Sequence, residues 1–277
     1  MKETIMNLNF RTPLVKALAA FSIISASAVL AGCGSSDAAT IPEAAPTPTT
    51  VVLVHGAWAD GSSWSKVTPL LQQRGLKVIS VQLQRASLAD DAAIVRRAME
   101  GVTGQVVLVG HSYGGAVVTE AGIDAKVATL VYVDAFTPGD NESITDILSP
   151  YPAPDWQKTL LQDSKGYLSL PLDTYVKTFA SDLPVADATL LSTYQGPIFY
   201  HVLDDKVTNA AWKTKPSFFV MGSNDLIIPP QFQQGEAARI KSTKVTTIPG
   251  ASHISMISHP TEVANVILEA VTSVHGL

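Results

Sequence analysis

Short apolar runs recur along the chain, and segments with helical periodicity lie between them. Each run is four to six residues long and almost continuously apolar. That pattern is typical of strands buried on both faces of a parallel sheet. The alternation of runs and helical segments predicts a doubly wound α/β fold with a mostly parallel sheet. The predicted strands are Val51–Val54, Val78–Leu83, Val106–Val109, Leu130–Asp134, Phe218–Met221 and Val245–Ile248.

Helix signals lie between and after these strands. Ser87-Leu88-Ala89-Asp90 has the spacing of a capping box, which predicts a helix that ends near Gly101. Further helices are predicted at Pro230–Ile240 and Pro260–His275, because proline is well tolerated in the first turn of a helix. The acidic pairs Asp90-Asp91 and Asp204-Asp205 are expected to cap helices or to carry surface charge.

Residues 137–215 interrupt the alternation, since they contain no clear central strand. An unstructured segment of this length is rare inside a compact domain. We therefore expect a helical cap inserted over the carboxyl edge of the sheet. Most aromatic residues of the cap are expected to pack its own core and a few to line a pocket; they are Tyr151, Trp156, Tyr167, Phe179, Tyr194, Phe199, Tyr200 and Trp212.

The first 32 residues have the pattern of a secretory signal. Basic residues precede Ala17–Ala31, an apolar stretch that is short for a permanent membrane span. The stretch ends in Leu30-Ala31-Gly32-Cys33, which resembles the lipobox of bacterial lipoproteins. The resemblance implies cleavage before Cys33 and acylation of that residue, and several acyl chains give stable membrane anchoring. An ordinary signal peptide with an incidental cysteine is the alternative.

Small residues and spaced prolines make residues 33–50 an expected flexible tether, which leaves residues 51–277 as one domain. Gly34 follows Cys33, whereas an aspartate there signals inner-membrane retention in enteric lipoproteins. We therefore expect an anchor in the outer membrane, facing the periplasm, in a host with two membranes. Cys33 is the sole cysteine, so no internal disulfide can form.

Charge excludes one large class of function. The net charge is −5 and no basic cluster is present, so nucleic acid is not an expected partner. No metal or nucleotide cofactor is expected either, because the glycines near residue 112 lack the Lys and Ser/Thr of a phosphate loop. The sequence sets no oligomeric state.

The strongest chemical signal is Gly110-His111-Ser112-Tyr113-Gly114-Gly115, which follows a predicted strand and precedes a segment able to form a helix. A strand, a G-x-S-x-G turn and a helix together form a nucleophile elbow. The turn holds the serine in a strained backbone conformation, and side chains at 110 and 114 would strike the neighbouring strand and helix. Ser112 is therefore the candidate nucleophile.

A serine nucleophile needs a base and an acid, which follow it in the order acid, then histidine. His253 lies on a small-residue loop after a predicted strand and is the candidate base. Asp225, just past another strand, is the favoured acid, and Asp134 is its rival. The other histidines after residue 200 are expected at the surface or at helix ends; they are His201, His259 and His275.

Two backbone N–H groups are candidates for an oxyanion hole. One belongs to Tyr113, directly after the nucleophile. The other belongs to Ala57, where Gly56 permits a tight bend after the first strand. His55 and His111 are expected to be structural.

These residues together resemble the α/β-hydrolase superfamily. His55-Gly56-Ala57-Trp58, followed by Gly61-Ser62-Ser63-Trp64, is similar to the branch with plant methylesterases, hydroxynitrile lyases and bacterial salicylate-esterase-like proteins. The resemblance implies an α/β-hydrolase fold with a cap. Lyases of the branch carry threonine after the first histidine and lysine after the catalytic one, where this chain has Gly56 and Ile254. Without that cation to hold cyanide, the resemblance favours an esterase.

The expected function is therefore a serine carboxylic ester hydrolase that forms an acyl-serine intermediate. The aromatic cap favours small to medium apolar or aryl esters. The alternatives are a cofactor-free perhydrolase resembling haloperoxidases, in which peroxide replaces water, and a lipoprotein that binds a ligand without turnover. The expected partners are a small ester and, through the lipid anchor, a membrane.

Overall fold

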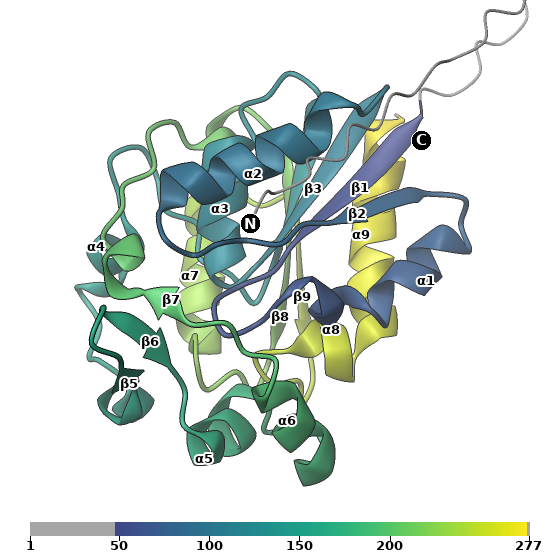
Figure 1. Ribbon diagram of the computed structural model, residues 1–277. Helices are drawn as coiled ribbons and strands as arrows, with labels where there is room; N and C mark the ends of the chain where they lie inside the picture. Colours follow the sequence, from purple (N-terminus) through teal and green to yellow (C-terminus); the bar gives the residue numbers. More distant parts are fainter. Residues whose placement is uncertain (1–47, 276–277) are drawn as a thin grey trace, which may run out of the picture. The chain divides into compact units, whose positions relative to one another are not determined.

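The computed structural model describes residues 48–275, which belong to one compact unit (Figure 1). The predicted signal peptide, Cys33 and nearly all of the predicted tether lie outside the described residues. Strand β1 begins at Thr49, inside the last part of that tether. It starts early because both of its edges are paired: Thr50 lies beside Lys77 of β2 on one side and Val106 of β3 on the other.

The main sheet has six strands in the order β2-β1-β3-β4-β8-β9, and every neighbouring pair is parallel. All six predicted strands are confirmed. Their bounds are β1 Thr49–Val54, β2 Lys77–Ser80, β3 Gln105–His111, β4 Val127–Val133, β8 Ser217–Gly222 and β9 Lys244–Ile248.

Strand β2 ends three residues earlier than predicted. It is an edge strand, and the apolar residues Val81 and Leu83 that extended the prediction lie in the following loop. Both side chains are nonetheless buried. Burial of a loop side chain thus produced the same sequence pattern as a buried strand.

Helices cover the sheet on both sides (Figure 1). Helices α2 and α3 pack together on one side, and α1 and α9 on the other. This coverage explains the continuous apolar runs, since residues such as Val52 and Leu108 in the central strands are fully buried. The helices of this part are α1 Val67–Gln72, α2 Leu88–Glu100, α3 Tyr113–Ala121, α7 Pro230–Arg239, α8 Ser255–Ser258 and α9 Pro260–Val274, with the 3-10 turn η1 Gly61–Trp64.

The inserted segment between β4 and β8 is less helical than predicted. It contains short helices and also a three-stranded antiparallel sheet in the order β5-β6-β7. A tight turn at Gly166, whose φ is 90°, allows β6 to pair back against β5. Its elements are α4 Ile144–Leu148, η2 Asp155–Thr159, β5 Leu161–Gln162, β6 Tyr167–Ser169, α5 Leu172–Thr174, η3 Tyr175–Phe179, α6 Val185–Ser192, β7 Ile198–Phe199, η4 Tyr200–Leu203 and η5 Ala211–Lys213.

The aromatic residues of this cap range from buried through half-buried to exposed. Phe179 is fully buried, in keeping with a packed lobe. Tyr151, Tyr194 and Tyr200 are instead exposed, so the expectation of a largely aromatic core was too broad. Short elements of two to eight residues leave many side chains at the surface.

Parallel strands bring distant loops to one edge of the sheet. The loops after β1, β3, β8 and β9 carry Ala57, Ser112, Asp225 and His253, respectively. Because all six strands run the same way, these loops meet at the carboxyl edge, where open α/β sheets bind ligands. Within residues 48–275, no helix is both long and apolar enough to cross a membrane.

Candidate active site

Ser112 occupies a sharp turn between β3 and α3. Its φ of 53° and ψ of −122° are rare for a residue with a side chain. A Cβ atom at Gly110 would strike the Gly114 carbonyl oxygen in α3. A Cβ atom at Gly114 would lie 2.6 Å from the His55 carbonyl oxygen and 2.8 Å from that of Val54 in β1. The predicted need for glycine at both positions is therefore confirmed, with the helix and the strand as the obstacles.

The structure brings Ser112, His253 and Asp225 into one hydrogen-bonded chain. Ser112 Oγ lies 2.9 Å from Nε2 of His253. Nδ1 of the same ring lies 2.8 Å from Asp225 Oδ2. The serine side chain does not cap α3, so its hydroxyl is available to the histidine. All three residues are buried, and only 5% of Ser112 is exposed.

Asp225 is held by donors besides the histidine. Its Oδ1 accepts hydrogen bonds from the N–H groups of Ile227 and Ile228, and its Oδ2 accepts one from the Gln233 side-chain amide. Burial raises the pKa of Asp225, and these three donors oppose that rise. They favour the ionised carboxylate, which is the form that accepts a hydrogen bond from the Nδ1–H of His253.

The rival acid, Asp134, makes different contacts. Its Oδ1 accepts a hydrogen bond from the Gly222 N–H at 2.7 Å, and its Oδ2 accepts one from the Ser255 hydroxyl at 2.5 Å. Its described hydrogen bonds do not include His253, whose Nδ1 is bonded to Asp225. The geometry therefore places Asp225, not Asp134, beside the candidate base.

Burial also sets the charge of the histidine. It lowers the pKa of His253 below the usual 6.5, so the ring is neutral at neutral pH. A neutral ring with its proton on Nδ1 leaves Nε2 free to accept the Ser112 proton. This is the protonation state that a general base requires.

His55 and His111 make only structural contacts among the described residues. His55 bonds the Gly56 carbonyl through Nδ1 and accepts the Leu83 N–H at Nε2. His111 donates from Nε2 to the carbonyl of His253 at 2.8 Å, and their ring centroids lie 4.9 Å apart. The contact between His111 and His253 joins residues 142 positions apart, so no local sequence signal could have indicated it.

The two candidate oxyanion donors belong to residues next to the hydrogen-bonded residues Ser112, His253 and Asp225. Tyr113 is the first residue of α3, so its N–H has no partner within the helix. Ala57 follows Gly56, where a Cβ atom would lie 2.6 Å from Ser112 Cβ. Among the hydrogen bonds of residues 48–275, none has the Ala57 N–H as its donor. Their role in binding an oxyanion remains a prediction.

Aromatic side chains from the cap contact the histidine. The Phe179 ring centroid lies 5.1 Å from that of His253 in an edge-to-face arrangement. Trp58, next to Ala57, packs against Phe179 at 6.3 Å and against Trp156 at 5.7 Å. Its indole N–H donates to the Leu168 carbonyl in β6. The loop after β1 and the cap thus form one aromatic wall, defined here as Trp58, Trp156 and Phe179.

The cap also forms hydrogen bonds with Ser252, the residue before His253. Asp182 accepts hydrogen bonds from the Ser252 N–H at 3.0 Å and from its hydroxyl at 2.5 Å. Sequence reasoning missed Asp182, and it named Phe179 only as one of eight cap aromatics, because the contacts of both depend on how the cap folds back onto the sheet. It also misjudged Asp91, which is fully buried and accepts the Tyr113 hydroxyl at 2.8 Å.

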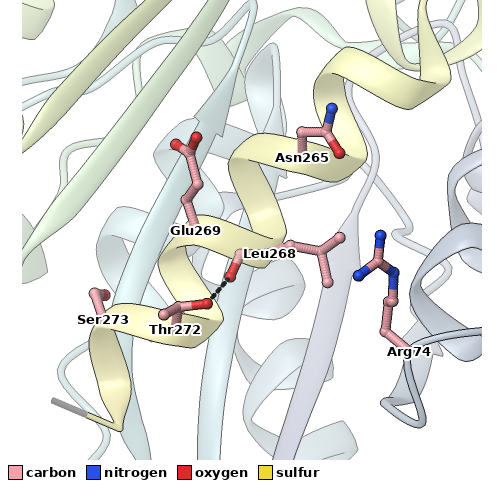
Figure 2. Close-up of a pocket in the computed structure, with 6 residues that line it drawn as sticks. All are labelled: Arg74, Asn265, Leu268, Glu269, Thr272 and Ser273. Atoms are coloured by element: carbon pink, nitrogen blue, oxygen red, sulfur yellow. Dashed lines mark hydrogen bonds between the residues drawn. The ribbon is translucent and has the colours of Figure 1, made fainter. Parts of the chain in front are cut away.

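A hollow of about 480 Å³ lies elsewhere, between α9 and Arg74 (Figure 2). Thr272 and Ser273 line it near the end of α9. His275, two residues further on, bonds Thr49 at the start of β1, so the hollow is at the amino edge of the sheet. Its position and its lining separate it from Ser112. Among the described residues, no group of three potential ligand side chains is arranged to hold a metal.

Known proteins resemble this chain in sequence and in fold. Salicylic acid-binding protein 2 of Nicotiana tabacum is 28% identical over 79% of this chain and 95% of its own. Methyl jasmonate esterase 1 of Vitis vinifera is 26% identical over 80% of this chain and 96% of its own. A crystal structure of polyneuridine aldehyde esterase superposes with a TM-score of 0.71 at 23% identity, covering 81% of this chain and 99% of that one.

A family profile gives the assignment. Residues 51–266 match the profile of the alpha/beta hydrolase family, which is most of the chain and all of the main sheet except the first two residues of β1. The match includes the elbow at Ser112 and the loops that carry Asp225 and His253. The protein is a member of the alpha/beta hydrolase family.

Proposed function

We propose that the protein is a serine carboxylic ester hydrolase acting on small to medium apolar or aryl esters. The observation that carries the proposal is the hydrogen-bonded chain from Asp225 through His253 to Ser112, at 2.8 and 2.9 Å. Those distances fall within the range expected for a nucleophile and its base. Relatives named as esterases support the same class of reaction.

The reaction begins when Ser112 Oγ attacks the ester carbonyl carbon. Nε2 of His253 takes the hydroxyl proton, and Asp225 stabilises the imidazolium that forms. The carbonyl oxygen becomes an oxyanion, which the N–H groups of Ala57 and Tyr113 are proposed to bind. Each such donor contributes on the order of 3 kcal/mol to the transition state.

The tetrahedral intermediate then collapses. His253 returns the proton to the leaving alkoxide, the carbon–oxygen bond breaks, and the alcohol departs from an acyl-serine. A water molecule gives one proton to His253 and attacks the acyl carbon. Collapse of the second intermediate returns that proton to Ser112 Oγ and releases the carboxylic acid.

The substrate class is inferred from the aromatic wall. Phe179 packs on His253 itself, and Trp58 follows the candidate oxyanion residue Ala57. Groups bound next to the ester carbonyl would therefore lie in aromatic surroundings, which favour apolar and aryl groups over charged ones. The wall consequently supports apolar or aryl esters.

Burst kinetics test the reaction. Purified protein mixed with p-nitrophenyl acetate or butyrate is expected to release about one equivalent of p-nitrophenol rapidly, followed by slower turnover. The matched variant is Ser112→Ala, which should show neither phase. Equal activity of both proteins would remove Ser112 as the nucleophile. A wild-type reaction that proceeds much faster with hydrogen peroxide than with water would favour the perhydrolase.

We further propose that Cys33 is lipidated and that it anchors the domain in the cell envelope, facing the periplasm. The support is the sequence Leu30-Ala31-Gly32-Cys33 after a basic and then apolar segment. Dual or triple acylation of one residue suffices for stable anchoring, because each buried CH₂ contributes about 0.8 kcal/mol.

A further inference from the structure

Asp134 is a buried carboxyl for which the proposed mechanism has no use. It follows β4, is fully buried and has a φ of 46°, a left-handed conformation that is uncommon for a residue with a side chain. Its N–H donates to the Val220 carbonyl in β8. A strained, buried acidic residue is costly for a fold, so its contacts indicate what it does.

The Asp134 carboxyl connects two loops. Oδ1 accepts the Gly222 N–H at 2.7 Å, and Gly222 is three residues before Asp225. Oδ2 accepts both the N–H and the hydroxyl of Ser255, at 3.3 and 2.5 Å, and Ser255 is two residues after His253. One side chain therefore bonds the end of β8, which leads into the loop of the candidate acid, and the start of α8, which follows the loop of the candidate base.

Other contacts also join the same two loops, including one through a side chain, in which the Gly250 N–H donates to the Ser223 hydroxyl oxygen at 2.8 Å. His111 bonds the carbonyl of His253, and the Asn224 N–H donates to the Ala251 carbonyl. Asp134 differs in coming from a third segment, directly after β4, and in bonding the residues at which the two loops meet β8 and α8. No larger residue fits at Gly222, because a Cβ atom there would lie 2.7 Å from the Ser252 carbonyl oxygen.

We propose that Asp134 is a positioning residue, whose carboxyl fixes the spacing between the Asp225 loop and the His253 loop. The proposal rests on the catalytic roles assigned to those two residues. A carboxyl suits this task better than an amide, because each of its oxygens accepts a backbone N–H. Asparagine offers one acceptor oxygen and would set an N–H against one of those donors.

Charge supports the same conclusion. Burial and the nearby charge of Asp225 raise the pKa of Asp134. Substitution at 134 therefore changes both the geometry and the electrostatic surroundings of the pair formed by Asp225 and His253. Its effect should be transmitted through that pair.

The test is a double-mutant cycle on the full-length protein in detergent. Asp134→Asn is expected to lower kcat for p-nitrophenyl butyrate by about 10- to 100-fold with KM changed less than about twofold, because small misplacement of reacting groups mainly affects the transition state. Asp225→Asn should lower kcat by about 10⁴-fold. In the Asp225→Asn background, Asp134→Asn should cost less than about threefold more.

Two further variants serve as a second test and as a control. Ser255→Ala removes one contact of Asp134 and should give a smaller loss of kcat that is likewise suppressed by Asp225→Asn; it carries the test if Asp134→Asn does not fold. Glu120→Gln removes another buried carboxylate, which bonds Thr208 and not these loops, and should leave kcat unchanged. An equal factor in both backgrounds, or wild-type kcat in Asp134→Asn, would overturn the proposal.

A fluorophosphonate probe separates this proposal from the proposed function. The probe phosphonylates an activated serine whether or not the protein hydrolyses esters. Wild-type labelling without ester turnover would refute the esterase and leave the effect of Asp134 measurable as a slower labelling rate. Absence of both labelling and turnover in the wild type would refute both proposals.

Discussion

At the scale of single residues, burial keeps histidines neutral. His55, His111 and His253 are fully buried, and burial lowers the pKa of each. For His253, neutrality gives the state that the proposed mechanism requires for accepting a proton from Ser112. For His55 and His111, neutrality allows ring nitrogens to bond backbone groups inside the core.

The pKa of His55 predicts an acid-sensitive contribution to stability. Burial lowers that pKa from 6.5 to about 4, so the unfolded chain takes up a proton below pH 6.5 while the folded one does not. The stabilisation by neutral His55 is thus complete above pH 6.5 and is lost as pH falls towards 4. The loss amounts to about 3 kcal/mol of unfolding free energy.

Urea unfolding of the wild type and His55→Gln at pH 7, 5.5 and 4 measures this contribution. Glutamine retains a donor and an acceptor but does not titrate in this range. The advantage of the wild type over the variant should therefore shrink as the pH falls. A constant difference across the three pH values would contradict the assignment.

At the scale of elements, α2 shows how local and distant caps combine. Ser87 accepts the Asp90 N–H, as the sequence predicted, but the Asp90 carboxyl accepts the Ser87 hydroxyl and not its N–H. The capping box is therefore only half formed. The next N–H, from Leu88, donates to Asp205 in the inserted segment at 2.8 Å. One helix start is thus stabilised by residues 117 positions apart.

Removal of the local cap should destabilise the protein measurably. Ser87→Ala leaves the Asp90 N–H without its partner and should lower the free energy of unfolding by about 1 kcal/mol. Urea denaturation with an unchanged m-value checks this. Ser65→Ala, at an exposed serine that ends the turn η1, is the control and should change stability by less than about 0.5 kcal/mol.

At the scale of the whole molecule, the domain is expected to determine activity and the proposed lipid anchor to determine location. The candidate catalytic residues Ser112, Asp225 and His253 meet at one edge of a parallel sheet, within residues 51–266 that match the family. The proposed lipid attachment, Cys33, lies before that part of the chain. Activity should therefore be independent of lipidation, whereas location should depend on it.

Cys33→Ala tests this separation in a double-membraned bacterial host. The wild type should sediment with the membranes, and the outer-membrane fraction should carry most of its esterase activity. The variant should lose radiolabelled palmitate incorporation and leave the membrane fraction, with its specific activity retained. Membrane association of an unlabelled variant would refute lipid anchoring through this residue.

The sequence by itself determined the strands and the elbow. Strands buried on both faces require continuous apolar runs, and the crowding at Ser112 requires glycine at 110 and 114. Both requirements act on neighbouring residues, so they leave a local pattern. The same holds for the small-residue loop that carries His253.

Only the tertiary structure decided between Asp225 and Asp134. Both follow strands that end at the same edge, so the sequence favoured Asp225 but left Asp134 as a rival. Folding sets Asp225 against His253 and uses Asp134 to join Gly222 and Ser255. Phe179 and Asp182 likewise reach the His253 loop only through the folded cap. These contacts join single side chains of distant segments. A single contact of this kind leaves no periodic pattern in the sequence.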